Sequence, residues 1–171
     1  MEIEQAIQQG ADEIDMVLPV GKFLMEDLEY VEYEIQVIKE RIGSVHLKVI
    51  LETGSLQDLS LIRKASFLAI GAGADFIKTS TGKASQGATP EAMAVMCLAI
   101  RDYYNRTGKK IGIKPAGGIS RTEDALLYFG IVRDILGEGW LNNERFRIGA
   151  SRLANDILAQ IFDKGPDFAY F

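Results

Sequence analysis

The sequence has little of the side-chain chemistry on which several classes of protein depend. His46 is the only histidine and Cys97 the only cysteine. A lone histidine at the start of a strand argues against a histidine–cysteine metal cluster and against a Ser-His-Asp triad. A lone cysteine cannot form an internal disulfide, which suits a reducing compartment. We therefore expect no metal, no cofactor and a cytoplasmic protein.

Long apolar runs and basic runs are also missing. Without a run of 18 apolar residues, no segment is expected to span a membrane. The acidic start, residues 1–4, has no signal-peptide pattern. The formal net charge of -5, with no cluster of lysines or arginines, argues against a nucleic-acid partner. A chain of 171 residues, 47% of them hydrophobic, is long enough for one soluble domain with a real core.

What is present is a regular alternation of strands and helices. The predicted strands are residues 13–18, 45–51, 75–80, 110–115 and 146–149. The predicted helices are residues 1–9, 26–42, 56–72, 89–105, 122–136 and 151–162, with a turn at 52–55. A strand–helix repeat of roughly 30 residues predicts an α/β fold with a parallel sheet and right-handed crossovers.

Two architectures are compatible with this repeat, an open doubly wound sheet and a closed (β/α)8 TIM barrel. A barrel normally has eight units in ~250 residues, whereas this sequence supplies about five. Its first residues already read as a helix. If the fold is a barrel, we expect a single N-terminally truncated domain over residues 1–171 that lacks three units, with 163–171 as a flexible tail.

Lys78 lies in a stretch, residues 74–83, that begins as a strand and ends as a polar loop. Its neighbours Phe76 and Ile77 are bulky and apolar. A buried ammonium loses hydration and tends to lose its proton, so such a lysine is most easily explained as a nucleophilic amine. The alternative is an edge strand from which Lys78 points to solvent.

Three more charged residues, Asp15, Lys48 and Lys114, fall within predicted strands. Two lysines that converge in a sheet are costly unless one cation lowers the pKa of its neighbour and leaves a free amine near neutral pH. Such an amine forms a Schiff base with a carbonyl, and Asp15 could then move protons. The alternative is ordinary lysine–aspartate pairing that stabilises the sheet.

Glycine-containing segments follow three of the strands, at residues 81–83, 117–120 and 149–151. Glycine lets the backbone approach a ligand closely, and the N–H groups at the start of a following helix favour an anion. In barrels, paired sites after the last two strands commonly hold a phosphate. These segments are either ordinary βα turns, which favour glycine, or a site for a phosphorylated ligand.

Four motifs in this order resemble the deoxyribose-phosphate aldolases: residues 10–17 (GADEIDMV), 47–54 (LKVILETG), 74–83 (ADFIKTSTGK) and 112–118 (GIKPAGG). The resemblance covers nearly the whole chain. It implies a (β/α)8 barrel and a class I aldolase, a lyase without a metal. Such an enzyme reversibly cleaves 2-deoxy-D-ribose 5-phosphate to glyceraldehyde 3-phosphate and acetaldehyde, in deoxyribonucleotide catabolism.

The resemblance also assigns roles to residues. Lys78 matches the Schiff-base lysine, Lys114 the second lysine that lowers its pKa, and Asp15 the acid that takes part in proton transfer. The positions that match substrate-binding residues, with the last six toward the phosphate, are Lys48, Thr81, Gly82, Lys83, Gly117, Gly118, Gly149 and Ser151.

The chain departs from the resembled pattern at three positions. Ser120 stands where some members carry a basic residue, with Arg121 one place later. Arg152 follows Ser151 where a second serine is common. Some members use a C-terminal tyrosine, whereas Tyr170 is the penultimate residue of this sequence.

The resemblance places three more strands before residue 9. We therefore expect exposed sheet edges and association with another copy of the chain. The alternative is an inactive fragment that acts only as an assembly unit.

Overall fold

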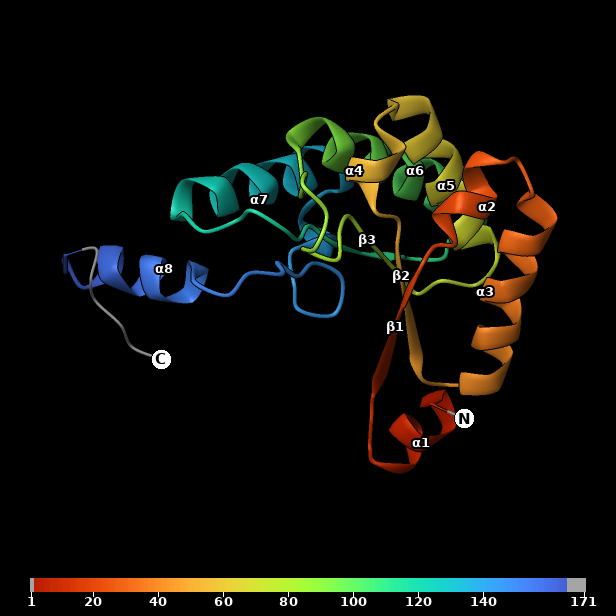
Figure 1. Cartoon of the computed structure of the whole chain (residues 1–171). Helices are drawn as coiled ribbons and strands as arrows, with labels where there is room; N and C mark the ends of the chain where they lie inside the picture. Colours follow the sequence, from red (N-terminus) through yellow and green to blue (C-terminus); the bar gives the residue numbers. More distant parts are fainter. Residues whose placement is uncertain (1, 166–171) are drawn as a thin grey trace.

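The computed structural model describes residues 2–165, and in them four parallel strands form one sheet (Figure 1). The strands are β1 (Glu13–Val17), β2 (His46–Ile50), β3 (Phe76–Lys78) and β4 (Gly112–Lys114). Their spatial order follows the sequence, β1-β2-β3-β4. Sequential parallel strands joined by helices are the arrangement of a TIM barrel, so the chain is a partial barrel rather than a doubly wound sheet.

The predicted fifth strand, residues 146–149, is two isolated bridges instead of a regular strand. Phe146 pairs with Ile113, and Gly149 pairs with Ala116. Between them the Gly149 N–H donates to the Pro115 carbonyl, at 2.8 Å. Pro115 has no N–H to return, so the ladder lacks one rung and the strand is interrupted.

The helices of the described chain lie mainly along one side of the sheet in Figure 1. They are α1 (Glu2–Gln8), α2 (Val20–Leu24), α3 (Leu28–Ile42), α4 (Thr53–Leu56), α5 (Leu59–Gly71), α6 (Pro90–Thr107), α7 (Thr122–Leu136), α8 (Leu153–Ile161) and the 3-10 turn η1 (Glu138–Trp140). No helix within residues 2–165 is both long and apolar enough to cross a membrane.

Helix starts follow their capping residues. The Thr89 hydroxyl accepts a hydrogen bond from the Ala92 N–H at 3.2 Å, as predicted for the start of α6. The predicted helix 56–72 was wrong at its start, because Asp58 caps α5 by accepting from the Ser60 N–H at 2.6 Å. The turn expected at 52–55 is the short helix α4, and α2 was not predicted at all. Each of these two helices has about one turn, too few residues for an apolar period to show.

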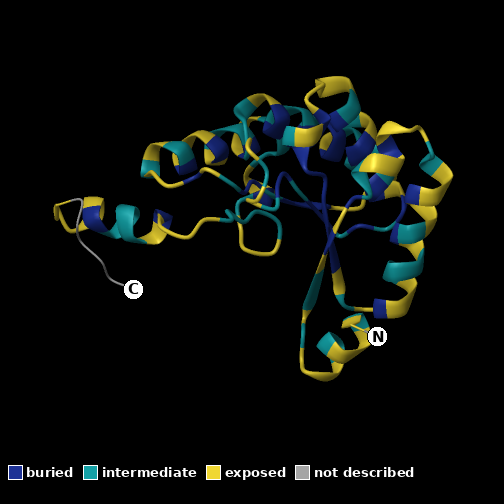
Figure 2. Cartoon of the chain, viewed as in Figure 1, coloured by how far each residue is buried: buried dark blue, intermediate teal, exposed yellow. Residues whose placement is uncertain are grey.

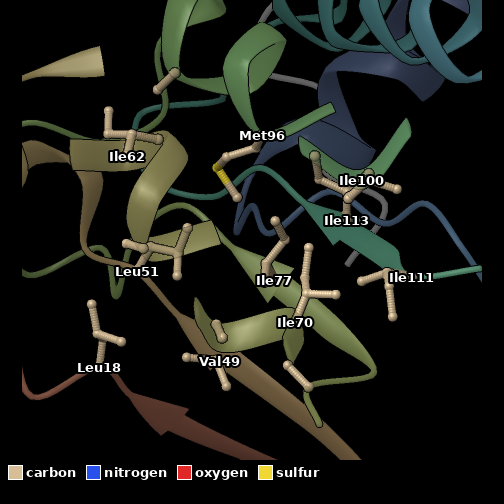
Figure 3. Close-up of a cluster of buried hydrophobic side chains, with 14 of the residues drawn as sticks. Leu18, Val49, Leu51, Ile62, Ile70, Ile77, Met96, Ile100, Ile111 and Ile113 are labelled. Carbon is tan, nitrogen blue, oxygen red and sulfur yellow. The ribbon is translucent and has the colours of Figure 1, made fainter. Parts of the chain in front are cut away.

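The hydrophobic core lies between the sheet and the helices that cover it. Alternate strand residues, such as Val49, Ile77 and Ile113, project into it and meet Ile70 of α5 and Met96 of α6 (Figure 3). Cys97 is also buried there, and burial raises the pKa of its thiol to about 12. Cys97 lies on α6.

The opposite face of the sheet carries the charged strand residues. Side chains alternate along a strand, so residues next to the core residues point the other way. Phe76 and Ile50 are buried yet lie outside the core cluster. In Figure 2 the strands are dark blue where they meet the helices, and the lower end of β1 is teal, since its first two residues are of intermediate exposure.

The end of the chain bears on two earlier expectations. Asp163 to Gly165 follow α8 in the structure. Tyr170 lies outside the described residues, as does the rest of 166–171, so the flexible tail stays a prediction.

Candidate active site

Strand register brings the predicted site residues onto one face. Lys78 is paired in register with Lys114 on β4. Asp15 is paired with Lys48 on β2. Because the strands are parallel and in this register, all four side chains project toward the same concave side of the sheet.

The Asp15 carboxylate joins two of the lysines. One of its oxygens accepts a hydrogen bond from Lys48 Nζ at 2.9 Å. The other lies 3.5 Å from Lys78 Nζ. The Lys78 side chain is only 13% exposed. The alternative in which Lys78 points to solvent from an edge strand is therefore wrong, because β3 is an inner strand between β2 and β4.

Lys114 shows the electrostatic cost of this cluster. Burial lowers the pKa of its ammonium below the usual 10.5, and repulsion from the cations of Lys48 and Lys78 lowers it further. Asp15 opposes the shift. Lys114 therefore gives up a proton more easily than an ordinary lysine.

Lys48 is the most deeply buried lysine of the site, with a side chain 4% exposed. Its ammonium also donates to a Glu13 carboxylate oxygen at 2.9 Å, and Glu13 is paired with Arg147. Neither Glu13 nor Arg147 was predicted for the site. The signal was available, since Glu13 precedes Asp15 by two residues and therefore shares its face of the strand.

A cavity of about 490 Å³ opens at the carboxyl ends of β3 and β4. The described residues that line it are Lys78, Thr81, Gly82, Lys114, Ala116, Gly117, Gly118, Ile119, Ser120, Gly149, Ala150, Ser151 and Arg152. Among these residues there are three cations and no carboxylate. Such a lining suits an anionic ligand, and the two strand lysines lie at its wall.

The loops around the cavity are held by close backbone contacts. A side chain at Gly87 would overlap the carbonyl of Gly117, so the two loops meet at glycines. The Thr79 hydroxyl donates to the Ala116 carbonyl at 3.0 Å and accepts from its N–H at 2.9 Å. These bonds fix the start of the loop after β4.

Glu52 organises the loop after β3. Its carboxylate accepts the Thr81 hydroxyl at 2.6 Å and the Thr81 N–H at 3.3 Å. The Thr81 hydroxyl accepts in turn from the Lys83 N–H at 3.1 Å. Thr81 therefore turns the chain around the cavity, and its hydroxyl is already engaged. Lys83 is exposed and does not line the cavity.

The two departures near the predicted phosphate end, Ser120 and Arg152, both lie at the cavity, but the arginine next to Ser120 does not. Ser120 and Arg152 both line the cavity. Arg121 does not line it. Its side chain is 70% exposed and pairs with Glu123 at 3.2 Å. The guanidinium at this end of the cavity thus comes from the loop before α8 instead of the loop before α7. No group of three or more histidine, cysteine or acidic residues in 2–165 is placed to hold a metal ion.

Comparison with known proteins gives one consistent family. Residues 1–129 match the family model described as DeoC/LacD family aldolase. The chain is 49% identical to deoxyribose-phosphate aldolase of Agrobacterium fabrum, over 92% of this chain and 60% of that protein. It is 47% identical to the human deoxyribose-phosphate aldolase, over 94% of this chain and 51% of that protein.

A solved structure supports the same fold. A deoxyribose phosphate aldolase from Aeropyrum pernix, described as having a unique tetrameric structure, superposes with a TM-score of 0.69 at 26% identity. The match covers 94% of this chain and 59% of that chain. This chain spans about half to three fifths of the length of these relatives.

Proposed function

We propose, from the premise that the chain belongs to the DeoC/LacD family of aldolases, that it cleaves 2-deoxy-D-ribose 5-phosphate to glyceraldehyde 3-phosphate and acetaldehyde. One observation carries the proposal. Lys78 and Lys114 are opposed in register beside the Asp15 carboxylate, at the wall of a cavity whose lining suits an anion. A lysine amine with a neighbouring cation and a proton carrier is the equipment of Schiff-base catalysis.

In the cleavage direction, the unprotonated Lys78 amine adds to the aldehyde carbon of the open-chain sugar. Loss of water leaves a protonated imine between Lys78 and that carbon. Asp15, 3.5 Å from Lys78 Nζ, is placed to move the protons of these steps, directly or through water. Lys114 stands beside this amine, in register with Lys78 on the next strand.

The bond between carbons 2 and 3 then breaks. The 3-hydroxyl gives up its proton, and the bonding electron pair moves into the imine to form an enamine while glyceraldehyde 3-phosphate leaves. The enamine carbon takes up one proton. Hydrolysis of the resulting imine consumes one water, returns the Lys78 amine and releases acetaldehyde. We propose that Asp15 and Lys114, which both lie beside Lys78, donate or accept the protons of these steps.

At the other end of the cavity, backbone and side-chain donors are suited to the phosphate. Gly117 and Gly118 both have positive φ angles, which bring the backbone of this loop close to a ligand. Gly149 and Ser151 line the same cavity, with Gly149 bridged to Ala116 beside this loop. We propose Gly82 as the contact from the third loop, and we leave Lys83 to the rim of the site.

The remaining parts of the proposal concern the whole protein. We propose a single aldolase-type domain, a cytoplasmic location and a homo-oligomer. The edge of β1, which pairs within the described sheet with β2 alone, supports the oligomer. The tetramer named for the Aeropyrum pernix relative points the same way.

The function is tested by trapping the imine. The protein is incubated with acetaldehyde or 2-deoxyribose 5-phosphate, reduced with borohydride, digested and mapped by mass spectrometry. The expected result is one adduct, on Lys78, in a sample that also turns over the sugar phosphate. The absence of an adduct, or labelling spread over many lysines, would contradict the proposal and favour the inactive fragment.

Arg152→Ser is expected to raise KM for 2-deoxyribose 5-phosphate about 10-fold, because a charge-assisted hydrogen bond to the phosphate is lost. The value of kcat should change little, since Arg152 lies away from the reacting carbon. Steady-state kinetics measure both constants. Arg121→Ser is the matched control and should leave KM unchanged, because Arg121 points to solvent. An equal effect of the two substitutions would remove Arg152 from the phosphate site.

A further inference from the structure

A second group of charges lies on the same face of the sheet, toward the amino ends of the strands. Glu13 is shared by two cations, Lys48 at 2.9 Å and the guanidinium of Arg147. Neither Glu13 nor Arg147 lines the cavity described above. If Glu13 and Arg147 influence the reaction at Lys78, they must do so through residues that lie closer to it.

The Glu13–Arg147 pair spans the sheet from one side to the other. Glu13 lies on β1, the first strand in the spatial order. Arg147 lies in the segment that bridges to β4 at the opposite side. On a flat sheet the two positions would be four strand spacings, about 19 Å, apart. That separation exceeds the combined reach of a glutamate and an arginine side chain. The pair therefore forms because the sheet curves toward a barrel.

The ring of Phe76 fills the space that this curvature encloses. The Arg147 guanidinium lies 4.7 Å from the ring centroid, and Lys48 Nζ lies 5.6 Å from it. Opposite the ring stands Gly112, where any side chain would overlap Phe76. Phe76 precedes Lys78 by two residues on the same face, so these groups form a floor beneath the reactive amine.

The electrostatics of the floor keep Glu13 ionised. Burial raises the pKa of the Glu13 carboxyl, but the hydrogen bonds from Arg147 and Lys48 outweigh it and bring the pKa to about 2. His46 is the third basic group facing Glu13, at 3.8 Å. The carboxylate therefore retains its charge throughout the neutral range.

We propose that Glu13 is a positioning residue of this site. It holds the Lys48 ammonium, and through Lys48 the Asp15 carboxylate, beside Lys78, while its pair with Arg147 keeps β1 curved toward the segment 146–149. Asp15 then reaches a lysine two strands away. This inference rests on the proposed function, since its readout is the reaction at Lys78.

The test is Glu13→Gln, which keeps the shape and removes the charge. The rate of imine trapping at Lys78 and kcat for the sugar phosphate are expected to fall roughly 10- to 100-fold, the effect of misplacing a reacting group. KM should stay near the wild-type value, because Glu13 does not touch the cavity. A role in stability alone would not give this division between kcat and KM.

A double-mutant cycle identifies the partner. Glu13→Gln removes the charge that holds both Lys48 and Arg147, so Arg147→Met alone should lose less than Glu13→Gln alone. Adding Arg147→Met to Glu13→Gln should then cause little further loss, because the Glu13–Arg147 pair is already broken. Arg147→Lys, which keeps the charge without the forked geometry, guards against a variant that fails to fold and should recover part of the rate. Fully additive losses of kcat would show that Glu13 and Arg147 act independently, and would overturn the role of their pair in positioning Asp15.

Asp102→Asn is the matched control. Asp102 is also a carboxylate paired with an arginine, at 2.7 Å from Arg63, but it lies on α6 away from the cavity. Its substitution should leave kcat unchanged. A wild-type protein without an adduct at Lys78 would overturn the proposed function and the positioning role together. A wild-type adduct with an unchanged rate in Glu13→Gln would overturn this inference alone.

Discussion

Replacing Lys78 by methionine is expected to lower turnover of 2-deoxyribose 5-phosphate roughly 10⁴-fold or more, because the nucleophile itself is lost. The remaining groups of the cluster cannot take its place. Lys48 is held by two carboxylates and is only 4% exposed. Lys114 lies in register with Lys78, one strand further from Asp15. Borohydride trapping should accordingly give no adduct at residue 78 or at its neighbours.

The fold should survive this substitution. The Lys78 ammonium is largely removed from water and lies beside other cations, so its loss relieves repulsion as well as breaking the contact with Asp15. Circular dichroism and thermal unfolding check this point. Lys64→Met is the matched control, since Lys64 is 41% exposed and pairs with Glu26 at 3.6 Å outside the site. Turnover by Lys78→Met within tenfold of wild type would show that the nucleophile lies elsewhere.

Much of the site could be predicted from the sequence because its signal is local. Lysines and an aspartate inside otherwise apolar strands are expensive, so their presence indicates a use. Glycines after the strands then predict a ligand site at the carboxyl ends. The structure places Lys78, Lys114 and Asp15 on one face, as these patterns predict.

The parts that were missed depend on contacts between distant residues. Glu13 and Arg147 are separated by 134 positions, and nothing in the sequence around either residue indicates that the two pair. The interrupted fifth strand depends on which residues after β4 meet the segment 146–149, and one of them is Pro115, which accepts from the Gly149 N–H but has no N–H of its own to donate. Arg152 lines the cavity and Arg121 does not, which depends on the directions taken by the loops before α8 and α7. Periodicity places Glu13 on the same strand face as Asp15, but it carries no information on the pairing with Arg147, on the proline or on the loop direction.

The share of its relatives' length that this chain spans is a separate matter from how much of the cavity its own residues line. It spans about half to three fifths of its relatives' length. The described cavity is nevertheless lined by residues from three loops of this one chain, and the amines that face it come from β3 and β4. The geometry of the amine cluster is therefore set by contacts that the chain makes internally, which is why single substitutions within it are informative.

Replacing Lys114 by methionine is expected to lower kcat about 100-fold, the usual range for loss of a group that moves or stabilises a proton. Stability should not suffer. The folded-state pKa of Lys114 lies below 10.5, mainly through burial, so the unfolded chain holds this proton more tightly than the folded one. Lys114 therefore disfavours folding below its folded-state pKa, and this cost declines as the pH rises toward 10.5.

The pH profile distinguishes a role for the Lys114 charge from simple packing. If the ammonium assists the reaction, the wild-type rate falls on the alkaline side with an apparent pKa below 10.5, as Lys114 loses its proton. Lys114→Met should lose this descending limb, so its pH optimum moves upward while its maximal rate stays low. Arg at this position would keep a charge at all pH values and should also lack the limb, with a higher rate than Met if charge is what matters. A descending limb that persists unchanged in Lys114→Met belongs to another group, and Lys114 would then serve only to fill the wall of the cavity.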